Sequence, residues 1–105
     1  MNNLDRFDLN NQNIIITGAA GKLGFYHAIA ILEKNGNPIL IDKNKSKLIE
    51  SKKKLESLFK KKIIIHKINL TNFKELKNFF KFYEGKKIYF DALINNADIN
   101  SKFNE

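Results

Sequence analysis

The chain has 105 residues, 19 of them basic and 11 acidic, and its net charge is +8. This length supports one domain, residues 1–105, with a modest apolar core. There is no cysteine, which excludes disulfides and thiolate metal sites, and no apolar run approaches the roughly 18 residues of a membrane span. The first residues lack the basic and apolar segments of a secretory signal, so we expect a cytoplasmic protein.

Strands and helices alternate strictly in the predicted secondary structure. Four short apolar runs predict strands, and three segments with helical periodicity predict helices. In chain order, the elements are a strand at 13–17, a helix at 22–35, a strand at 38–42, a helix at 45–60, a strand at 63–68, a helix that begins after Thr71 or Asn72 and ends at Gly85, and a strand at 91–95.

The helical periodicity also predicts which side chains face the core. In the first helix these are Leu23, Ala28, Ile31 and Leu32. In the third helix, one broad apolar face holds Phe73, Leu76, Phe79, Phe80 and Tyr83. Glu75 is placed for a capping box with Asn72.

The segment 45–62, KSKLIESKKKLESLFKKK, carries the densest positive charge. Leu48, Leu55 and the pair Leu58-Phe59 recur in it at helical spacing, so we expect its lysines to form the solvated face of an amphipathic helix. A nucleic-acid-binding patch is the less favoured alternative. The chain has a single arginine, Arg6, whereas arginine is the preferred residue for contacts to phosphates and base edges.

Strands that are apolar throughout and separated by helices predict a parallel sheet covered on both faces. Right-handed crossovers then give the strand order 3-2-1-4. The fold class is therefore α/β, with a β-α-β-α-β-α-β chain that forms the first half of a Rossmann-like doubly wound sheet.

Three glycines follow the first predicted strand at a spacing of three: Gly18, Gly21 and Gly24. Gly18 lets the chain leave the strand, Gly21 lets the backbone approach a pyrophosphate, and Gly24 lets the helix pack closely. The free N–H groups around Lys22 and Leu23 would then face an anion at the helix N-terminus. A tight strand-helix turn without a ligand would use similar glycines, so this pattern alone is weak evidence.

Asp42 is the last residue of the predicted strand at 38–42, 18 positions beyond Gly24. A carboxylate at this place can accept hydrogen bonds from both hydroxyls of an adenosine ribose. The alternative is that Asp42 is a turn or cap residue before the next helix. Together, the glycines and Asp42 favour a dinucleotide site.

Four segments, TGAAGKLG, ILID, INLTN and DALINNA, have the order and spacing of the N-terminal half of short-chain dehydrogenases/reductases. From about Phe7 onward the chain resembles this family, and INNA is the most specific element. The resemblance implies that Thr17 and Asn95 join the strand ends. It also implies an NAD(P) site formed by Gly18, Gly21, Lys22, Leu23, Gly24, Asp42, Asn69, Leu70, Asn96 and Ala97. In that site Asp42 recognises the adenosine ribose, Asn69-Leu70 lie beside adenine, and Asn96-Ala97 line the cofactor ribose.

The sequence departs from the common pattern of the family in three places. The glycine spacing is TGxxGxxG, as in extended members, where classical members have TGxxxGxG. Asn69 stands where an aspartate usually meets adenine, and Asp98 stands where the family keeps a small neutral residue. A carboxylate at 98 would be unfavourable near a bound pyrophosphate unless it points to solvent.

The catalytic residues of the family, a serine and a Tyr-x-x-x-Lys pair on a later helix, lie beyond the last residue of this chain. Tyr83 and Lys87 match the spacing, but they end the third helix, so we interpret the match as chance. No catalytic residue is assigned. We expect the cofactor half of an oxidoreductase acting on an alcohol or ketone, a sugar derivative among the candidates, truncated from a longer parent. The alternative is a non-catalytic nucleotide-binding or interaction module.

NAD is the expected cofactor because Asp42 would repel the 2′-phosphate of NADP, an effect that Lys22 and Lys43 would partly offset. No metal site is expected, because His27 and His66 lack partners at metal-ligand spacing. The strand at 91–95 lacks a neighbour on one side. We therefore expect self-association there, or a missing C-terminal half that covers it.

Overall fold

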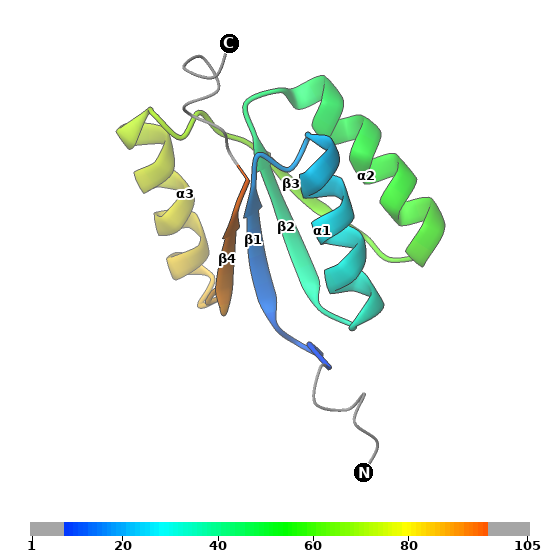
Figure 1. The fold of residues 1–105 in the computed structure, drawn as a ribbon. Coiled ribbons are helices and arrows are strands. Elements are labelled where there is room, and N and C mark those ends of the chain that lie inside the picture. Colours follow the sequence, from blue (N-terminus) through cyan, green and yellow to red (C-terminus); the bar gives the residue numbers. More distant parts are fainter. Residues whose placement is uncertain (1–7, 97–105) are drawn as a thin grey trace.

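The computed structural model describes residues 8–96, which form a four-stranded parallel sheet of order β3-β2-β1-β4 with three helices (Figure 1). The elements are β1 (Asn13–Thr17), α1 (Lys22–Glu33), β2 (Asn37–Asp42), α2 (Lys45–Phe59), β3 (Ile64–Lys67), α3 (Phe73–Gly85) and β4 (Ala92–Asn95). The predicted fold class, strand order and alternation of elements are confirmed. No helix within residues 8–96 is long and apolar enough to cross a membrane.

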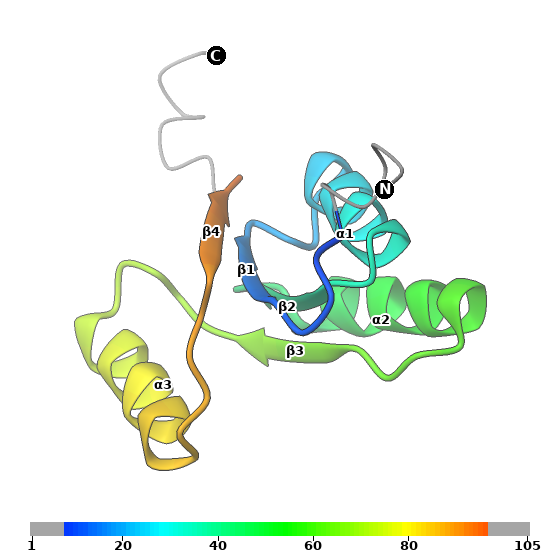
Figure 2. The same cartoon turned by 90° about the horizontal axis from the view of Figure 1, so that it is seen from below.

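Successive side chains of β1 enter different cores on the two faces of the sheet. Ile14 and Ile16 pack with Leu40 of β2 in the core beneath α1 and α2. Ile15 lies in the second core with Ile39, on the face covered by α3. Figure 2 shows α3 on one side of the sheet and the pair α1 and α2 on the other. Because both faces of β1 and β2 are covered, the central residues of these strands are all apolar, Ile14–Ile16 in β1 and Pro38–Ile41 in β2.

The inward face of α1 differs from the prediction at one residue. Ala28, Ile31 and Leu32 are buried as predicted, but Leu23 is 60% exposed. Gly24 is buried instead, and it lies on the same helical stripe as Ala28 and Ile31. Leu23 precedes that stripe by one residue and therefore faces away from the core.

The inward face of α3 is narrower than predicted. Only Phe79 and Tyr83, four residues apart, are buried, whereas Phe73 is 77% exposed and Phe80 is 46% exposed. The sheet lies along one side of the helix, so a single i, i+4 row reaches it. Large rings bridge the two layers, with Phe79 stacked on Phe90 at a centroid distance of 5.7 Å. Asn72 is the N-cap, and its side chain accepts from the N–H of Glu75 at 3.2 Å.

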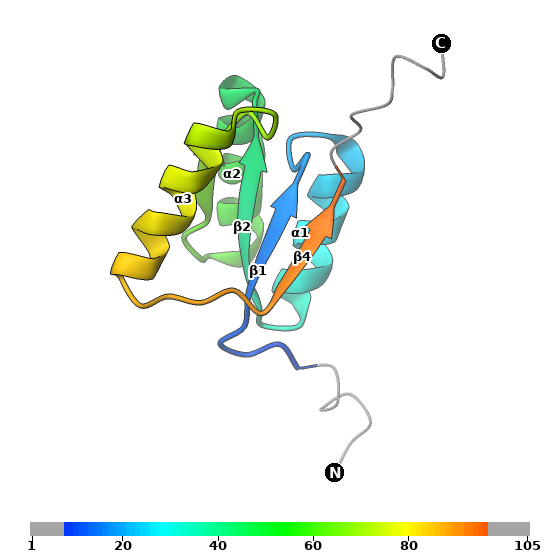
Figure 3. The same cartoon turned by 90° about the vertical axis from the view of Figure 1, so that its left-hand side faces the viewer.

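β4 is the edge strand, and no described helix lies in front of it in Figure 3. Its Leu93 side chain is 61% exposed. Ile94, on the opposite face of the strand, packs against the core beneath α1. The apolar exposure expected for this strand is therefore present on one face.

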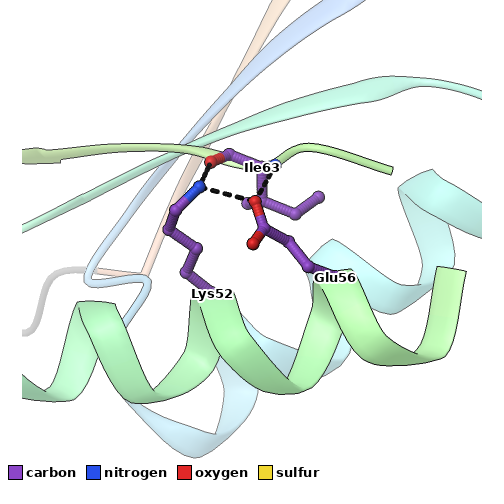
Figure 4. A network of polar contacts seen from close by, with 3 residues as sticks. All are labelled: Lys52, Glu56 and Ile63. Atoms are coloured by element: carbon purple, nitrogen blue, oxygen red, sulfur yellow. Dashed lines mark hydrogen bonds and ion pairs between the residues drawn. The ribbon is translucent and has the colours of Figure 1, made fainter. Parts of the chain in front are cut away.

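A three-residue polar network joins α2 to the start of β3 (Figure 4). Glu56 Oε2 accepts from Lys52 Nζ at 2.5 Å and from the N–H of Ile63 at 2.8 Å. Lys52 Nζ also donates to the carbonyl of Ile63 at 2.5 Å. These hydrogen bonds, first that from Lys52 and then that from Ile63, lower the pKa of Glu56. The network thus fixes the chain reversal between α2 and β3 and requires an ionised Glu56.

We predict that Glu56→Gln lowers the free energy of unfolding at neutral pH. Because the folded-state pKa lies below the ordinary value of 4.5, the carboxylate stabilises the fold above pH 4.5 and loses this contribution as the pH falls through the folded-state pKa. Urea unfolding across this range should show the difference between wild type and Glu56→Gln shrinking in acid. Glu50→Gln is the control, because among residues 8–96 Glu50 pairs with exposed Lys54 on the same helix alone, at 3.3 Å. An equal effect of both variants would contradict the assignment.

Candidate cofactor-binding site

The four parallel strands end at one edge of the sheet, where the predicted site residues gather. Thr17, Asp42 and Asn95 are the last residues of β1, β2 and β4. The glycine loop, residues 18–21, leaves β1 at this edge and leads directly into α1. Ligands of open α/β sheets bind outside the carboxyl ends of the strands, so this edge is the candidate site.

The glycine loop folds back tightly onto the first turn of α1. Gly18 has φ 63°, in the left-handed region that favours glycine. A Cβ at Gly24 would lie 2.7 Å from both the Ala19 Cα and the Gly18 carbonyl oxygen. At Gly21 a Cβ would meet only the Gly18 oxygen, at an ordinary 3.5 Å. The backbone conformation thus favours glycine at 18, and contacts within the chain require it at 24, whereas at 21 the space outside the loop stays open.

The N–H groups of the loop are used by the protein itself. Ala19 N–H donates to the carbonyl of Ile41 at 3.1 Å, and Gly21 N–H donates to that of Gly18 at 3.3 Å. Ala20 N–H donates to Asp42 Oδ2 at 3.1 Å. These bonds fix the loop against β2 before any ligand binds.

The N-terminus of α1, in contrast, keeps free donors. Its first intrahelical bond runs from Phe25 N–H to the Gly21 carbonyl, and Gly21 supplies no side-chain cap. The N–H groups of Lys22, Leu23 and Gly24 thus donate to no other residue within 8–96. Asparagine side chains cap both α2 and α3. Three free N–H groups at the positive end of a helix form a site suited to a phosphate group.

Asp42 has the role of a turn residue and a second role as well. Its Oδ1 accepts from Asn44 N–H at 2.9 Å, the local bond expected of a turn residue before α2. Its Oδ2 holds the N–H of Ala20. An ionised carboxylate has about four acceptor positions, so the side chain can still accept from a ribose hydroxyl. The turn role and the predicted ribose role are therefore compatible.

Asn69 and Leu70 lie in the loop that joins β3 to α3. Asn69 Oδ1 accepts from the N–H of Thr71 at 3.0 Å and from its hydroxyl at 2.7 Å. The residue found in place of the usual aspartate thus stabilises a local turn. Leu70 packs against the core beneath α3.

The ends of β1 and β4 are joined as the family resemblance implied. Thr17 Oγ1 donates to Asn95 Oδ1 at 2.8 Å, and Asn96 N–H donates to the Thr17 carbonyl at 3.1 Å. Asn96 Nδ2 also lies 2.9 Å from Nδ1 of His27 on α1, a contact that no local pattern in the sequence predicts. Ala97, another predicted site residue, lies outside the described residues, as does Asp98.

Tyr83 lies away from this edge, in the core beneath α3. It is 4% exposed, and its hydroxyl is 2.6 Å from Nε2 of His66. Burial raises the pKa of Tyr83 and lowers the pKa of His66. A catalytic tyrosine of this family needs a lowered pKa, so the geometry favours the interpretation of Tyr83-x-x-x-Lys87 as chance. Within residues 8–96 no cluster of three His, Asp or Glu side chains could hold a metal ion.

A parallel sheet with a glycine loop and an uncapped helix at its carboxyl edge defines the dinucleotide-binding class of α/β proteins. The family model of short chain dehydrogenases matches residues 12–105, and the chain belongs to this family. The expected family membership is thereby confirmed.

Three known proteins illustrate the similarity. The short chain dehydrogenase/reductase dpfgG of Gibberella zeae is 30% identical over 95 residues, which is 90% of this chain and 34% of that protein. UDP-glucose 4-epimerase of Dictyostelium discoideum is 30% identical over 71 residues, 68% of this chain and 21% of the epimerase. A structure with bound NAD, assigned as a D-mannonate oxidoreductase from Haemophilus influenza, has a TM-score of 0.73 and 26% identity over 88% of this chain and 32% of its own. The chain thus spans about a third or less of the length of each of these three proteins.

We predict that Gly24→Ala destabilises the fold by about 1–3 kcal/mol, because the added methyl group meets backbone atoms that cannot move aside. Gly21→Ala is the matched control and should cost less than about 1 kcal/mol, the scale of a change at a helix N-cap. Urea unfolding of the two variants gives the comparison. Equal losses of stability would show that the close approach of loop and helix is absent in solution.

Proposed function

We propose that this chain forms the cofactor-binding part of an NAD(P)-dependent oxidoreductase that acts on an alcohol or ketone. The observation that carries the proposal is the uncapped N-terminus of α1, with three free N–H groups beside the Asp42 carboxylate. The N–H groups suit a pyrophosphate and the carboxylate suits a ribose. Both lie at the edge of the sheet where α/β proteins bind dinucleotides. We propose 1–105 as a single domain.

Each part of the cofactor has proposed contacts in this chain. The N–H groups of α1 and the open space at Gly21 would receive the pyrophosphate, and Asp42 the adenosine ribose. Asn69 and Leu70 are proposed to lie beside adenine. Asn96 and Ala97 are proposed to line the cofactor ribose. The full set is Gly18, Gly21, Lys22, Leu23, Gly24, Asp42, Asn69, Leu70, Asn96 and Ala97.

The bound nicotinamide would supply the hydride chemistry, and the residues of this chain would bind and orient it. Burial raises the pKa of Tyr83, the opposite of what a proton donor of this family needs, so we assign no proton donor within residues 8–96. The sugar-related names of two similar proteins, the epimerase and the D-mannonate oxidoreductase, support a sugar derivative as the substrate class. The second candidate is a non-catalytic nucleotide-binding module, which the free N–H groups of α1 would serve equally well.

NAD is the form of cofactor that we propose. The NAD bound in the D-mannonate oxidoreductase structure supports this choice, as does the charge of Asp42.

A feature that favours NADP lies near Asp42. A cavity of about 410 Å³ behind the glycine loop is lined in part by Lys22, Lys47 and Lys54. Lysines at this place would partly offset the repulsion of a 2′-phosphate.

Calorimetric titration with NAD and NADP tests both proposals. We expect NAD to bind more tightly by about tenfold, the change that corresponds to roughly 1.4 kcal/mol of charge repulsion. Asp42→Asn should weaken NAD binding and remove most of the preference. Asp91→Asn is the control, because Asp91 accepts from Asn13 N–H, at the start of β1 and so at the opposite edge of the sheet. Tighter binding of NADP by the wild type would reverse the cofactor assignment, and no binding of either would overturn the proposed function.

The exposed edge at β4 supports a further part of the proposal, self-association of this chain. Its exposed Leu93 would pack against a second copy unless another segment covers it. We expect concentration-dependent oligomers by size exclusion with light scattering, reduced by Leu93→Lys. Leu58→Lys is the control, because Leu58 is similarly exposed, at 65%, but lies on α2. A monomer at every concentration would contradict this part of the proposal.

A further inference from the structure

A hydrogen bond joins the middle of α1 to the residue that follows β4. His27 Nδ1 and Asn96 Nδ2 are 2.9 Å apart, and both side chains are half-buried. His27 lies three residues after Gly24, on the helix whose N-terminus carries the free N–H groups. The helix that supplies these N–H groups therefore also contacts Asn96, which lies 69 residues after His27 in the sequence.

The chemistry of this contact fixes the direction of the Asn96 carboxamide. Nδ2 of Asn96 carries two hydrogens and can only donate a hydrogen bond. Nδ1 of His27 must therefore be the acceptor, and the imidazole proton lies on Nε2. Asn96 Oδ1 then points away from His27, and no group within residues 8–96 donates to it. The backbone at this point is also held, because Asn96 N–H donates to the Thr17 carbonyl. The carboxamide is thus anchored at its nitrogen and leaves its oxygen as an acceptor.

We infer that His27 is a positioning residue for the cofactor. It holds Asn96 so that Oδ1 can accept a hydrogen bond from a ribose hydroxyl of the bound dinucleotide, without itself contacting that ligand. This inference rests on the proposed function, in which Asn96 lines the cofactor ribose. His27 would act by reducing the orientations that the carboxamide samples before binding, since ordering it on binding costs affinity.

The hydrogen bond can be tested without any cofactor. The chain has two histidines, so nitrogen NMR of the rings at pH 8 is simple to assign. We expect His27 Nδ1 to be unprotonated and hydrogen-bonded, and His27→Phe to shift the side-chain amide signals of Asn96. His66→Phe is the control, because His66 contacts Tyr83 in the other core and should leave those amide signals unchanged. A protonated Nδ1 in His27, or unchanged Asn96 signals in His27→Phe, would overturn the inference.

Binding of NAD, measured by calorimetry, tests the positioning role. His27→Phe keeps a ring of similar size but removes the acceptor, and we expect its Kd for NAD to rise about fivefold, on the scale of one net hydrogen bond. His27→Asn should restore binding, because its Oδ1 occupies the place of Nδ1 and accepts from Asn96. An unchanged Kd in His27→Phe, or a failure of His27→Asn to restore binding, would overturn the inference alone. No binding of NAD by the wild-type chain would overturn the proposed function, and this inference with it.

Discussion

The close approach of the first turn of α1 to the glycine loop is the contact on which the carboxyl edge depends. With a Cβ at Gly24, the loop would have to move away from Ala19 and the Gly18 oxygen, only 2.7 Å distant. Moving the loop would also displace Ala20 from the Asp42 carboxylate and change the direction of the α1 axis. This packing determines the direction in which the free N–H groups of α1 point. A contact between backbone atoms therefore determines where the positive end of the helix faces.

Asp42 couples the two halves of the candidate site. One carboxylate oxygen holds the glycine loop, and the other holds the start of α2 through Asn44 N–H. The residue proposed to recognise the ribose is therefore also the residue that orders the surface beneath a pyrophosphate. Replacing Asp42 changes the geometry of the loop and the contacts to the ligand together, so a change in affinity alone does not separate the two effects. The preference between NAD and NADP is more informative, because a change in loop geometry affects both cofactors.

The two faces of the sheet are packed by different kinds of side chain. Small and branched residues of α1 and α2 pack directly on the strands, with Ala28 fully buried. α3 instead reaches the sheet through large rings, including Phe79 and Tyr83. Rings bury much area per residue but need space between helix and strand. This side of the sheet also leaves Leu93 exposed, so further protein surface packed there would bury apolar area.

The sequence alone determined the order of elements, the parallel sheet and the family. Continuous apolar strands require cover on both faces, and the right-handed crossover rule leaves few strand orders, so these features follow from local pattern. It also located Gly18, Gly24 and Asp42, because glycine spacing and the end of a strand can be read from the chain. The bond between Thr17 and Asn95 followed from the family resemblance.

Only the tertiary structure decided which side chains meet across the fold. Periodicity fixes a helical face to within about one residue, so it predicted Leu23 as buried where Gly24 is. Periodicity could not predict that a single row of side chains on α3 would reach the sheet, because the distance between helix and sheet depends on the rings that fill the space between them. The contact between His27 and Asn96 joins residues 69 positions apart, and no local pattern specifies such a pair. It arises because β4 pairs in parallel with β1, so the end of β4 lies next to the end of the strand from which α1 follows.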